Sequence, residues 1–435
     1  MGINYRFVDE NLKKELVELR RMFHRFPEAG WMEFLTTCKI VEYLDRLGFK
    51  VFYGQNFLKP GQRWGQPLER FVKESMLNAE KHGVPRGFID EVKNGFTGAA
   101  GVMRFSESGP VCVFRFDIDG LRITESTKEG HRPFELGFSS ENENYMHACG
   151  HDGHMAVGLC LAKILSDNRH RLKGEARFIF QPAEEGCRGG QAVAESGFIE
   201  SADYVLGGHI GVCSLKKGET AAVKGGFLCT TKLDIHFLGH SAHASNSPES
   251  GRNALLAAAE FVLSANAIPR HSGGATMVNI GVLNAGEGRN IIPDTAYVEA
   301  ETRGETQRLN EYMKTELIRR ANGAAAMYGC EVEIEMAGEA GGFASNADLK
   351  AAAKEICGAM GEGVSYAEKN FGASEDFSNL AVEAEKYGAK SAYFTFGSAV
   401  KGVHHSPEFD FDEDTMALEL EFFARAAQRF MGSED

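Results

Sequence analysis

The hydrophobic pattern of the chain begins with two helices and continues as strands that alternate with helices. Leu12, Leu16 and Leu19 recur at helical spacing within residues 10–26, and a second helical pattern occupies residues 32–47. Short apolar runs typical of strands follow, with the helical stretch MAVGLCLAKILS between the third and the fourth. These runs are KVFYG, AGVMRF, VCVFRFD, EARFIFQ and YVLGGHI. The pattern predicts an α/β fold in which helices cover a central sheet.

Two stretches depart from this alternation. Residues 55–95 are rich in Gly, Pro and charge, with a helical pattern near residues 68–81, and are typical of an insertion. Residues 229–338 follow the order βαββαβ, which predicts a ferredoxin-like domain with two helices on one face of an open sheet. Because 435 residues exceed the ~250–300 at which one core stops growing, we expect this domain to interrupt a larger one made of residues 1–228 and 339–435.

Composition narrows the class of partner and the compartment. The formal net charge of −14 disfavours nucleic acid, since phosphate binding requires a basic surface. The nine cysteines form neither a C-x-x-C pair nor an even framework, which favours a reducing compartment, and the cytoplasm is the expected one. The start of the chain lacks an apolar signal core, and the sequence lacks the ~18-residue apolar run that spans a bilayer. We therefore expect a soluble protein that is not attached to a membrane.

Potential metal ligands are concentrated in the stretch HACGHDGH. Cys149 and His151 are two positions apart, so in an extended segment both side chains would project to the same side. Thiolate with imidazole suits zinc, and imidazole also accepts manganese or cobalt. The competing interpretation of this stretch alone is a structural cluster of polar residues.

Further ligand-type residues follow the next strand-like runs. Glu184 and Glu185 come just after EARFIFQ, His209 ends YVLGGHI, and GVHHSPEF near the C-terminus offers another histidine. Ligands of open α/β sheets bind beyond the carboxyl ends of the strands, where one glutamate could bind metal while its neighbour transfers a proton. A solvated glutamate pair on a turn is the alternative. Consecutive predicted strands that all end in metal-type ligands favour the metal site.

The motifs together resemble a known family. RFDID, HACGHDGH, FQPAEEG, GGHIG, HSAHAS, GRNIIPD, ASEDFS and HHSPEF occur in this order from about Phe105 onward. This series is similar to that of the two-metal amidohydrolases, which include aminoacylase, hippurate hydrolase and indoleacetyl-amino-acid hydrolases. The long segment before Phe96 is most similar to the branch that acts on p-aminobenzoyl-glutamate. RFDIDGLR departs from the usual Arg-Ala-Asp-x-Asp-Ala-Leu-Pro at Phe116 and Arg122, so the shape of the substrate pocket does not follow from the family pattern.

The resemblance implies a set of site residues. It makes Glu184 the general base and gives Asp117 and Asp119 a supporting role around the metal ligands. It makes the inserted domain a lid or dimerisation domain, whose His243 reaches the substrate carbonyl, with His240 as the rival. Two more residues of that domain, Asn290 and Arg303, would hold the substrate. The implied metal ligands are Cys149, which bridges the ions, with His151, Glu185, His209 and His405, although the adjacent His404 leaves the last assignment open.

The resemblance also implies the reaction. It points to two divalent metal ions, manganese rather than zinc, and to hydrolysis of the amide bond of an N-acyl or N-aroyl amino acid. The implied substrate is p-aminobenzoyl-glutamate, which gives p-aminobenzoate and glutamate. A homodimer, or a heteromer with a homologous chain, would form through the lid. The alternatives are a general aminoacylase or dipeptidase of the same family, and a metal-holding subunit without catalytic activity, against which the carboxylate of Glu184 argues.

Overall fold

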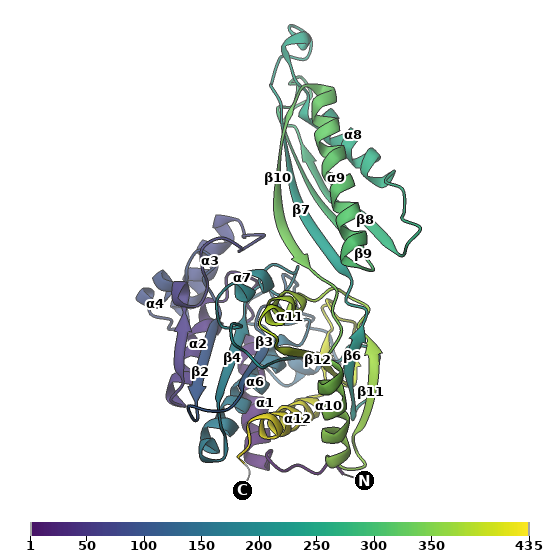
Figure 1. Cartoon of the computed structure of the whole chain (residues 1–435). Helices are drawn as coiled ribbons and strands as arrows, with labels where there is room; N and C mark the ends of the chain where they lie inside the picture. The colour runs from purple at the N-terminus through teal and green to yellow at the C-terminus, as the bar shows by residue number, and fades with distance from the viewer. Residues whose placement is uncertain (1, 434–435) are drawn as a thin grey trace. The chain divides into compact units, whose positions relative to one another are not determined.

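The computed structural model describes residues 2–433, and contacts between Cα atoms divide the chain into two compact units. Unit 1 consists of residues up to 226, residues 343–372 and residues from 376 onward, and unit 2 consists of residues 227–342 and 373–375. Both units combine helices with a sheet (Figure 1), which confirms the predicted α/β class. The domain boundaries expected after residues 228 and 338 stay predictions.

Unit 1 is built on a mixed sheet, which within residues 2–433 has eight strands in the order β1-β2-β4-β3-β5-β12-β6-β11. β4, β3, β5 and β12 run parallel to their neighbours in that order, whereas β1 and β2 are antiparallel and β12 pairs antiparallel with β6. The strands are β1 Lys50–Tyr53, β2 Ala99–Arg104, β3 Val111–Asp117, β4 Glu175–Gln181, β5 Tyr204–Ile210, β6 Glu219–Gly225, β11 Ser365–Asn370 and β12 Lys390–Phe396.

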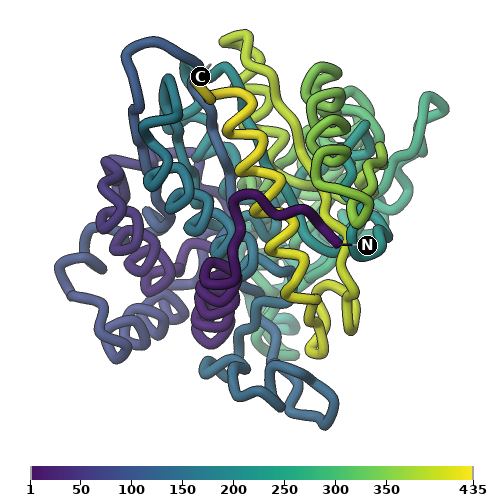
Figure 2. The backbone as a smooth tube through the Cα atoms, turned by 90° about the horizontal axis from the view of Figure 1, so that it is seen from below, coloured from purple at the N-terminus to yellow at the C-terminus, as the bar shows by residue number. Residues whose placement is uncertain are grey.

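Helices cover this sheet, and their sequences explain where they form. Helix α1 begins after Asp9, whose side chain accepts the backbone N–H of Leu12 as an N-cap, and it buries Leu16 and Phe23. The N-terminal α1 and the C-terminal α12 lie side by side (Figure 2), and both pack on α6. The helices of unit 1 are α1 Glu10–Arg25, α2 Phe34–Arg46, α3 Glu69–Lys81, α4 Arg86–Val92, α5 Arg132–Glu135, α6 His151–Asp167, α7 Gly190–Ala194, α10 Ala347–Ala359, α11 Phe377–Lys386 and α12 Asp414–Met431.

The middle strands are buried on both faces, and this fixes the edge at which the site forms. Nearly every residue of β3, β4 and β5 is buried, as expected for parallel strands covered by helices on both sides. Helix α6 approaches the sheet closely at Gly158, where a Cβ atom would lie 2.6 Å from the ring of Phe116. Because β4, β3 and β5 are parallel neighbours, their carboxyl ends meet at one edge.

Unit 2 has the ferredoxin-like order of elements that its sequence pattern predicts. Its described residues form an antiparallel four-stranded sheet in the order β10-β7-β9-β8. Alternate residues of β9, among them Val298 and Ala300, are buried in a core shared with the two helices. The elements of unit 2 are β7 Cys229–Leu238, α8 Ala254–Asn266, β8 Thr276–Ala285, β9 Thr295–Gly304, α9 Gln307–Tyr328 and β10 Glu331–Ala340. No helix within residues 2–433 is long and apolar enough to cross a membrane.

A buried guanidinium ties the first helix of unit 1 to its last segments. Arg20 is 0% exposed and donates to Asp152 at 2.8 Å, to Asp410 at 2.7 Å and to Glu413 at 3.1 Å. These carboxylates come from α6 and from the chain just before α12. Each charge is compensated only while the guanidinium is present, because burial makes an unpaired carboxylate costly.

We expect Arg20→Met to lower the free energy of unfolding by about 3–5 kcal/mol, because it leaves three carboxylates without their cation. Urea unfolding at neutral pH measures this. Arg25→Met is the matched control in the same helix, since the pair of Arg25 with Glu141 is 45% and 42% exposed and should contribute less than about 1 kcal/mol. Equal losses in the two variants would contradict the role given to Arg20.

Candidate metal centre

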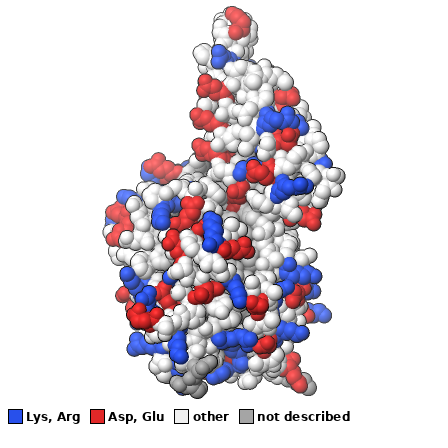
Figure 3. All heavy atoms as spheres, viewed as in Figure 1, with Lys and Arg blue, Asp and Glu red and all other residues white. Residues whose placement is uncertain are grey.

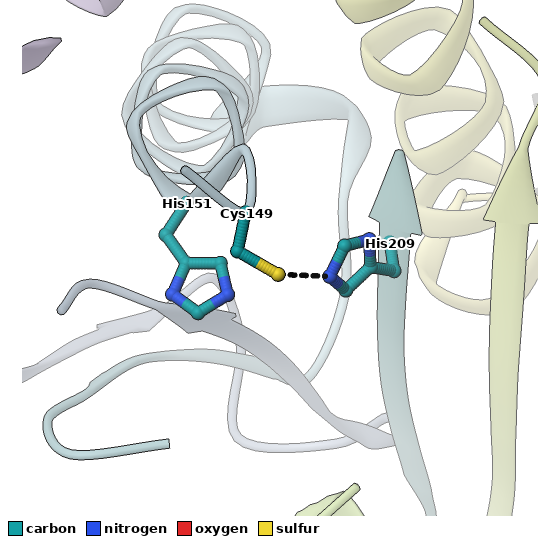
Figure 4. Close-up of side chains that lie close together, drawn as sticks. All are labelled: Cys149, His151 and His209. Atoms are coloured by element: carbon teal, nitrogen blue, oxygen red, sulfur yellow. Dashed lines mark hydrogen bonds between the residues drawn. The ribbon is translucent and has the colours of Figure 1, made fainter. Parts of the chain in front are cut away.

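Potential metal ligands converge where β3, β4 and β5 end. The sulfur of Cys149 lies 3.4 Å from Nε2 of His209, which is the penultimate residue of β5. Figure 4 shows Cys149 and His151 projecting from the start of α6 toward the same space as His209. All three are almost completely buried, with Cys149 the most exposed at 9%. The predicted meeting of a thiol and two imidazoles is therefore present.

The reason for this convergence differs from the one expected. Cys149 and His151 are not in an extended segment, since His151 is the first residue of α6. Gly150 between them has a φ of +93°, in the left-handed region that a residue without Cβ adopts freely. The turn at Gly150, rather than the alternation of a strand, brings the two side chains to one side, so the assumption of an extended segment was wrong.

Hydrogen bonds fix the proton position on both imidazoles. Nδ1 of His151 donates to the backbone carbonyl of Asp119 at 2.9 Å, and Nδ1 of His209 donates to the carbonyl of Ile210 at 2.8 Å. Nε2 of each ring therefore carries a lone pair. Among the described residues, Nε2 of His151 has no hydrogen-bond partner although it is buried. Imidazoles that ligate metal are held in this way, by a second hydrogen bond from the other nitrogen.

Cys149 also belongs to a second group of potential ligands. Its sulfur lies within 4.8 Å of ligand atoms of His151 and His209, and likewise of Glu185 and His405. Nε2 of His405 is 3.3 Å from Oε1 of Glu185. A thiolate shared by two such groups has the position that a bridging ligand needs. The donor set of sulfur, imidazole and carboxylate fits a divalent transition metal.

The two adjacent histidines of HHSPEF differ in their surroundings. Hydrogen bonds to Cys149 and Glu185 raise the pKa of His405 to about 10. Burial lowers the pKa of His404 to about 4, and its ring packs on Phe409 with centroids 4.7 Å apart. His405 has a φ of +64°, which is uncommon for a residue with a Cβ atom and turns its ring to the cluster. The geometry thus groups His405, rather than His404, with the other potential ligands.

Asp119 holds the loop that carries the two glutamates. Its Oδ1 and Oδ2 accept the backbone N–H groups of Glu184 at 3.1 Å and Glu185 at 3.0 Å. The carboxylate of Glu33 accepts the N–H of the preceding residue, Ala183, at 2.9 Å. Ala183 and Cys187 have φ values of +52° and +57°, a strain of about 1–3 kcal/mol each. These buried carboxylates compensate for that strain.

Asp117 connects to residues within the motifs to which the sequence analysis gives no role. Its Oδ1 accepts Nδ1–H of His154 at 2.6 Å, and Nε2 of His154 accepts the N–H of Ile210 at 3.0 Å. Both ring nitrogens of His154 are therefore engaged, which makes it a support rather than a ligand. The other oxygen of Asp117 accepts from Arg115 at 2.9 Å, and Arg115 also donates to Asp376 at 3.0 Å.

The electrostatics of the centre indicate a place for positive charge. Burial alone would lower the pKa of His151, but the charges of Asp117 and Cys149 raise it well above its ordinary value. Burial alone would raise the pKa of Asp117, but the charges of His151, His154 and Arg115 hold it well below its usual range. Protons on imidazole thus balance the negative groups of the cluster. A divalent cation would supply the same compensation.

The remaining predicted residues lie in unit 2. His243 pairs with Ile291 in a β-bridge, and the carbonyl of the adjacent Asn290 accepts the N–H of Ala244 at 3.1 Å, so His243 and Asn290 are on neighbouring segments. Nδ1 of His243 accepts backbone N–H groups of Ser245 and Asn246, both at 3.2 Å. Arg303 lies near the end of β9 and forms an ion pair with Glu301. His240 forms a β-bridge with Arg252.

Comparisons with known proteins agree with this fold and site. The model of the family described as "Peptidase family M20/M25/M40" matches residues 113–429. The chain is 38% identical, over 96% of both chains, to "Indole-3-acetyl-aspartic acid hydrolase" of Enterobacter agglomerans. It is also 38% identical, over 97% of both chains, to one of the subunits of "p-aminobenzoyl-glutamate hydrolase" of Escherichia coli K12. The crystal structure of the "Aminobenzoyl-glutamate utilization protein" from Klebsiella pneumoniae is similar with a TM-score of 0.81, at 33% identity and 96% coverage of both chains.

The fold and the cluster define a hydrolase of the amidohydrolase and metallopeptidase class. The chain belongs to the M20 peptidase family, which confirms the family and the enzyme class predicted from its motifs.

We expect Asp119→Asn to weaken binding of divalent metal about 10–100-fold, because an amide can accept only one of the two N–H groups and its NH₂ would face the other. Competition with a chromogenic chelator measures the affinity. Asp203→Asn is the control, since Asp203 accepts the N–H of Val111 at the opposite end of β3. The assignment is wrong if both variants bind metal like the parent.

Proposed function

We propose that the chain hydrolyses the amide bond of an N-aroyl or N-acyl amino acid, with p-aminobenzoyl-glutamate as the leading substrate. The observation that carries this proposal is the placement of Cys149 in two ligand groups beside Glu184 and Glu185, in a chain 38% identical to part of a p-aminobenzoyl-glutamate hydrolase. The products would be p-aminobenzoate and glutamate.

The proposed cofactor is a pair of divalent ions, manganese rather than zinc. Cys149 would bridge them, and His151, His209, Glu185 and His405 would complete the ligand set. When bound, such ions lower the pKa of a water molecule and polarise the amide carbonyl. The hydrogen bonds from Nδ1 of His151 and His209 to carbonyl oxygens support this set, because they leave Nε2 of each ring as a ligand atom.

Glu184 is proposed to move the proton. Its side chain is only 12% exposed, and its Oε2 lies 3.9 Å from Nε2 of His151. At that place the carboxylate can take a proton from the attacking water and deliver it to the leaving nitrogen, as a general base and then a general acid. Its backbone N–H is held by Asp119, so the carboxylate starts from a fixed position.

His243 of unit 2 is proposed to stabilise the negative charge that develops on the substrate carbonyl oxygen. Because Nδ1 of His243 accepts two backbone N–H groups, the proton of the neutral ring is on Nε2. An exposed Nε2–H is the donor that this role needs, and one such donor contributes ~3 kcal/mol. Asn290, on the neighbouring segment, is proposed as a substrate contact.

A second substrate and a partner chain follow from the names of the relatives. The relative from Enterobacter agglomerans is named for indole-3-acetyl-aspartate and has the same 38% identity as the relative named for p-aminobenzoyl-glutamate. Both names contain an acidic amino acid joined to an aromatic acyl group. The relative from Escherichia coli is one component of a hydrolase with more than one kind of chain, which motivates a heteromer with a homologous chain as the alternative to a homodimer.

The first assay is release of p-aminobenzoate from p-aminobenzoyl-glutamate by the purified chain, after chelation and after addition of Mn²⁺ or Zn²⁺. Activity restored by metal is expected, with Mn²⁺ the better ion. Faster cleavage of indole-3-acetyl-aspartate would favour the second substrate, and preference for aliphatic N-acyl substrates would favour a general aminoacylase. Bound metal without turnover of any of these, even with a homologous partner chain, would contradict the proposal.

We expect Glu184→Gln to lower kcat by about 10²–10⁴, because it removes the group that transfers the proton. Its metal content should equal that of the parent, measured by elemental analysis. Glu185→Gln is the contrasting variant and should lose metal. Parental activity in Glu184→Gln would show that the chemistry lies elsewhere.

Selection of an acidic substrate requires particular basic side chains. Lys and Arg are interspersed with Asp and Glu over the face drawn in Figure 3, so a broad basic surface on that face does not attract the substrate. Arg303 and Arg270 line a pocket of about 320 Å³ in unit 2, together with Asn279 and Glu301. A guanidinium can hold a carboxylate through two parallel hydrogen bonds.

We expect Arg303→Ala to raise KM about 10–100-fold for glutamyl substrates, since a hydrogen bond to a charged group contributes ~1.5–3 kcal/mol. Neutral N-acyl amino acids should be affected much less. Arg319→Ala, at an exposed ion pair in α9, should leave both KM values unchanged. An equal effect on acidic and neutral substrates would remove Arg303 from the carboxylate site.

A further inference from the structure

The insertion at residues 55–95 contacts the loop that carries Glu184 and Glu185. Nε of Arg188 donates to the backbone carbonyl of Glu185 at 2.7 Å, and Nη1 donates to the backbone carbonyl of Gly65 at 3.1 Å. One guanidinium therefore bridges the glutamate loop and the insertion, and both segments lie within unit 1.

A second contact joins the insertion to the same loop from the other side. Nε1 of Trp31, which is 0% exposed, donates to the carbonyl of Trp64 at 2.6 Å. At the preceding Gly30, a Cβ atom would lie 2.2 Å from Nη2 of Arg188 and 2.9 Å from Cα of Ala183. The turn at residues 30–31 is thus packed directly on the glutamate loop while it holds the insertion.

The insertion is itself anchored to the body of unit 1. Its helices α3 and α4 bury Ala79, Ile89 and Val92 in an apolar cluster shared with Phe34 and Leu35 of α2. Residues 61–66 form no helix or strand, and Arg63 holds this stretch by donating to the carbonyl of Asn94 and lying 3.8 Å from the ring centroid of Phe96. The carbonyls that Trp31 and Arg188 contact are therefore presented from a packed support.

We infer that Arg188 is a positioning residue for Glu184 and Glu185, and that the insertion acts on the catalytic step through it. This inference rests on the proposed function, in which Glu184 transfers the proton. A loop with left-handed φ values at Ala183 and Cys187 keeps its shape only through contacts that fix its backbone. Small displacements of a catalytic group lower the rate of the chemical step strongly, so kcat should change more than KM.

The kinetic test uses Arg188→Met, Trp31→Phe and the double variant in the full chain with metal. Arg188→Met should lower kcat about 10–100-fold with KM within about twofold. Trp31→Phe removes only the N–H that reaches the insertion and should lower kcat in the same direction. Because both substitutions break one link, the double variant should be no slower than Arg188→Met. Arg177→Met is the matched control, since Arg177 of β4 also bridges two backbone carbonyls, those of Phe198 and Glu200.

Hydrogen exchange gives a readout that does not depend on activity. Peptides covering residues 183–190 should exchange faster in Arg188→Met and in Trp31→Phe, and at the parental rate in Arg177→Met. Parental exchange of this loop in Trp31→Phe, or losses of kcat that add in the double variant, would overturn the inference. Should the parent cleave none of the acyl amino acids, the proposed function fails, while exchange still decides whether the insertion holds the loop.

Discussion

The residue on which the site depends most is Asp119, just beyond the end of β3. Its carboxylate accepts the N–H groups of Glu184 and Glu185, and its carbonyl accepts Nδ1–H of His151. One residue therefore fixes both the glutamate loop after β4 and the first side chain of α6. It can do so because β3 and β4 are parallel neighbours whose ends meet at the same edge of the sheet. Since Asp119 is 1% exposed, its carboxylate depends on these hydrogen bonds in place of water.

Compensation of charge is the second principle of unit 1. Buried carboxylates and imidazoles at the strand ends balance one another, and Arg115 closes the balance behind Asp117. Arg20 does the same for Asp152, which follows His151 in α6. The two arginines thus carry permanent positive charge on the far side of residues that contact the site, while the site itself is balanced by protons on imidazole. Permanent cations outside the cluster and exchangeable protons inside it are what a metal centre requires before the metal binds.

The sequence allowed the fold class and the place of the site to be predicted, because both follow from local patterns. Buried parallel strands have long apolar runs, and ligand-type residues directly after several such runs must meet at one edge. The wrong expectation was the extended segment at Cys149, since a left-handed glycine inside C-G-H has no signature beyond the glycine itself. The roles of His154, Arg115 and Asp376 depend on partners up to 261 positions away, and one sequence contains no signal for such pairs.

The glutamate loop shows why catalytic geometry needs more than its own sequence. Glu184 and Glu185 are held at their N–H groups by Asp119, the preceding residue by Glu33, and the carbonyl of Glu185 by Arg188. Each support comes from a different part of unit 1, and their sum keeps non-glycine residues in left-handed conformations that they would otherwise leave. Adjacent carboxylates with separate tasks need this: if the backbone could rotate, the two side chains would exchange places. The loop is therefore best understood as a strained segment whose shape is imposed by the strands, the turn at Gly30 and the insertion around it.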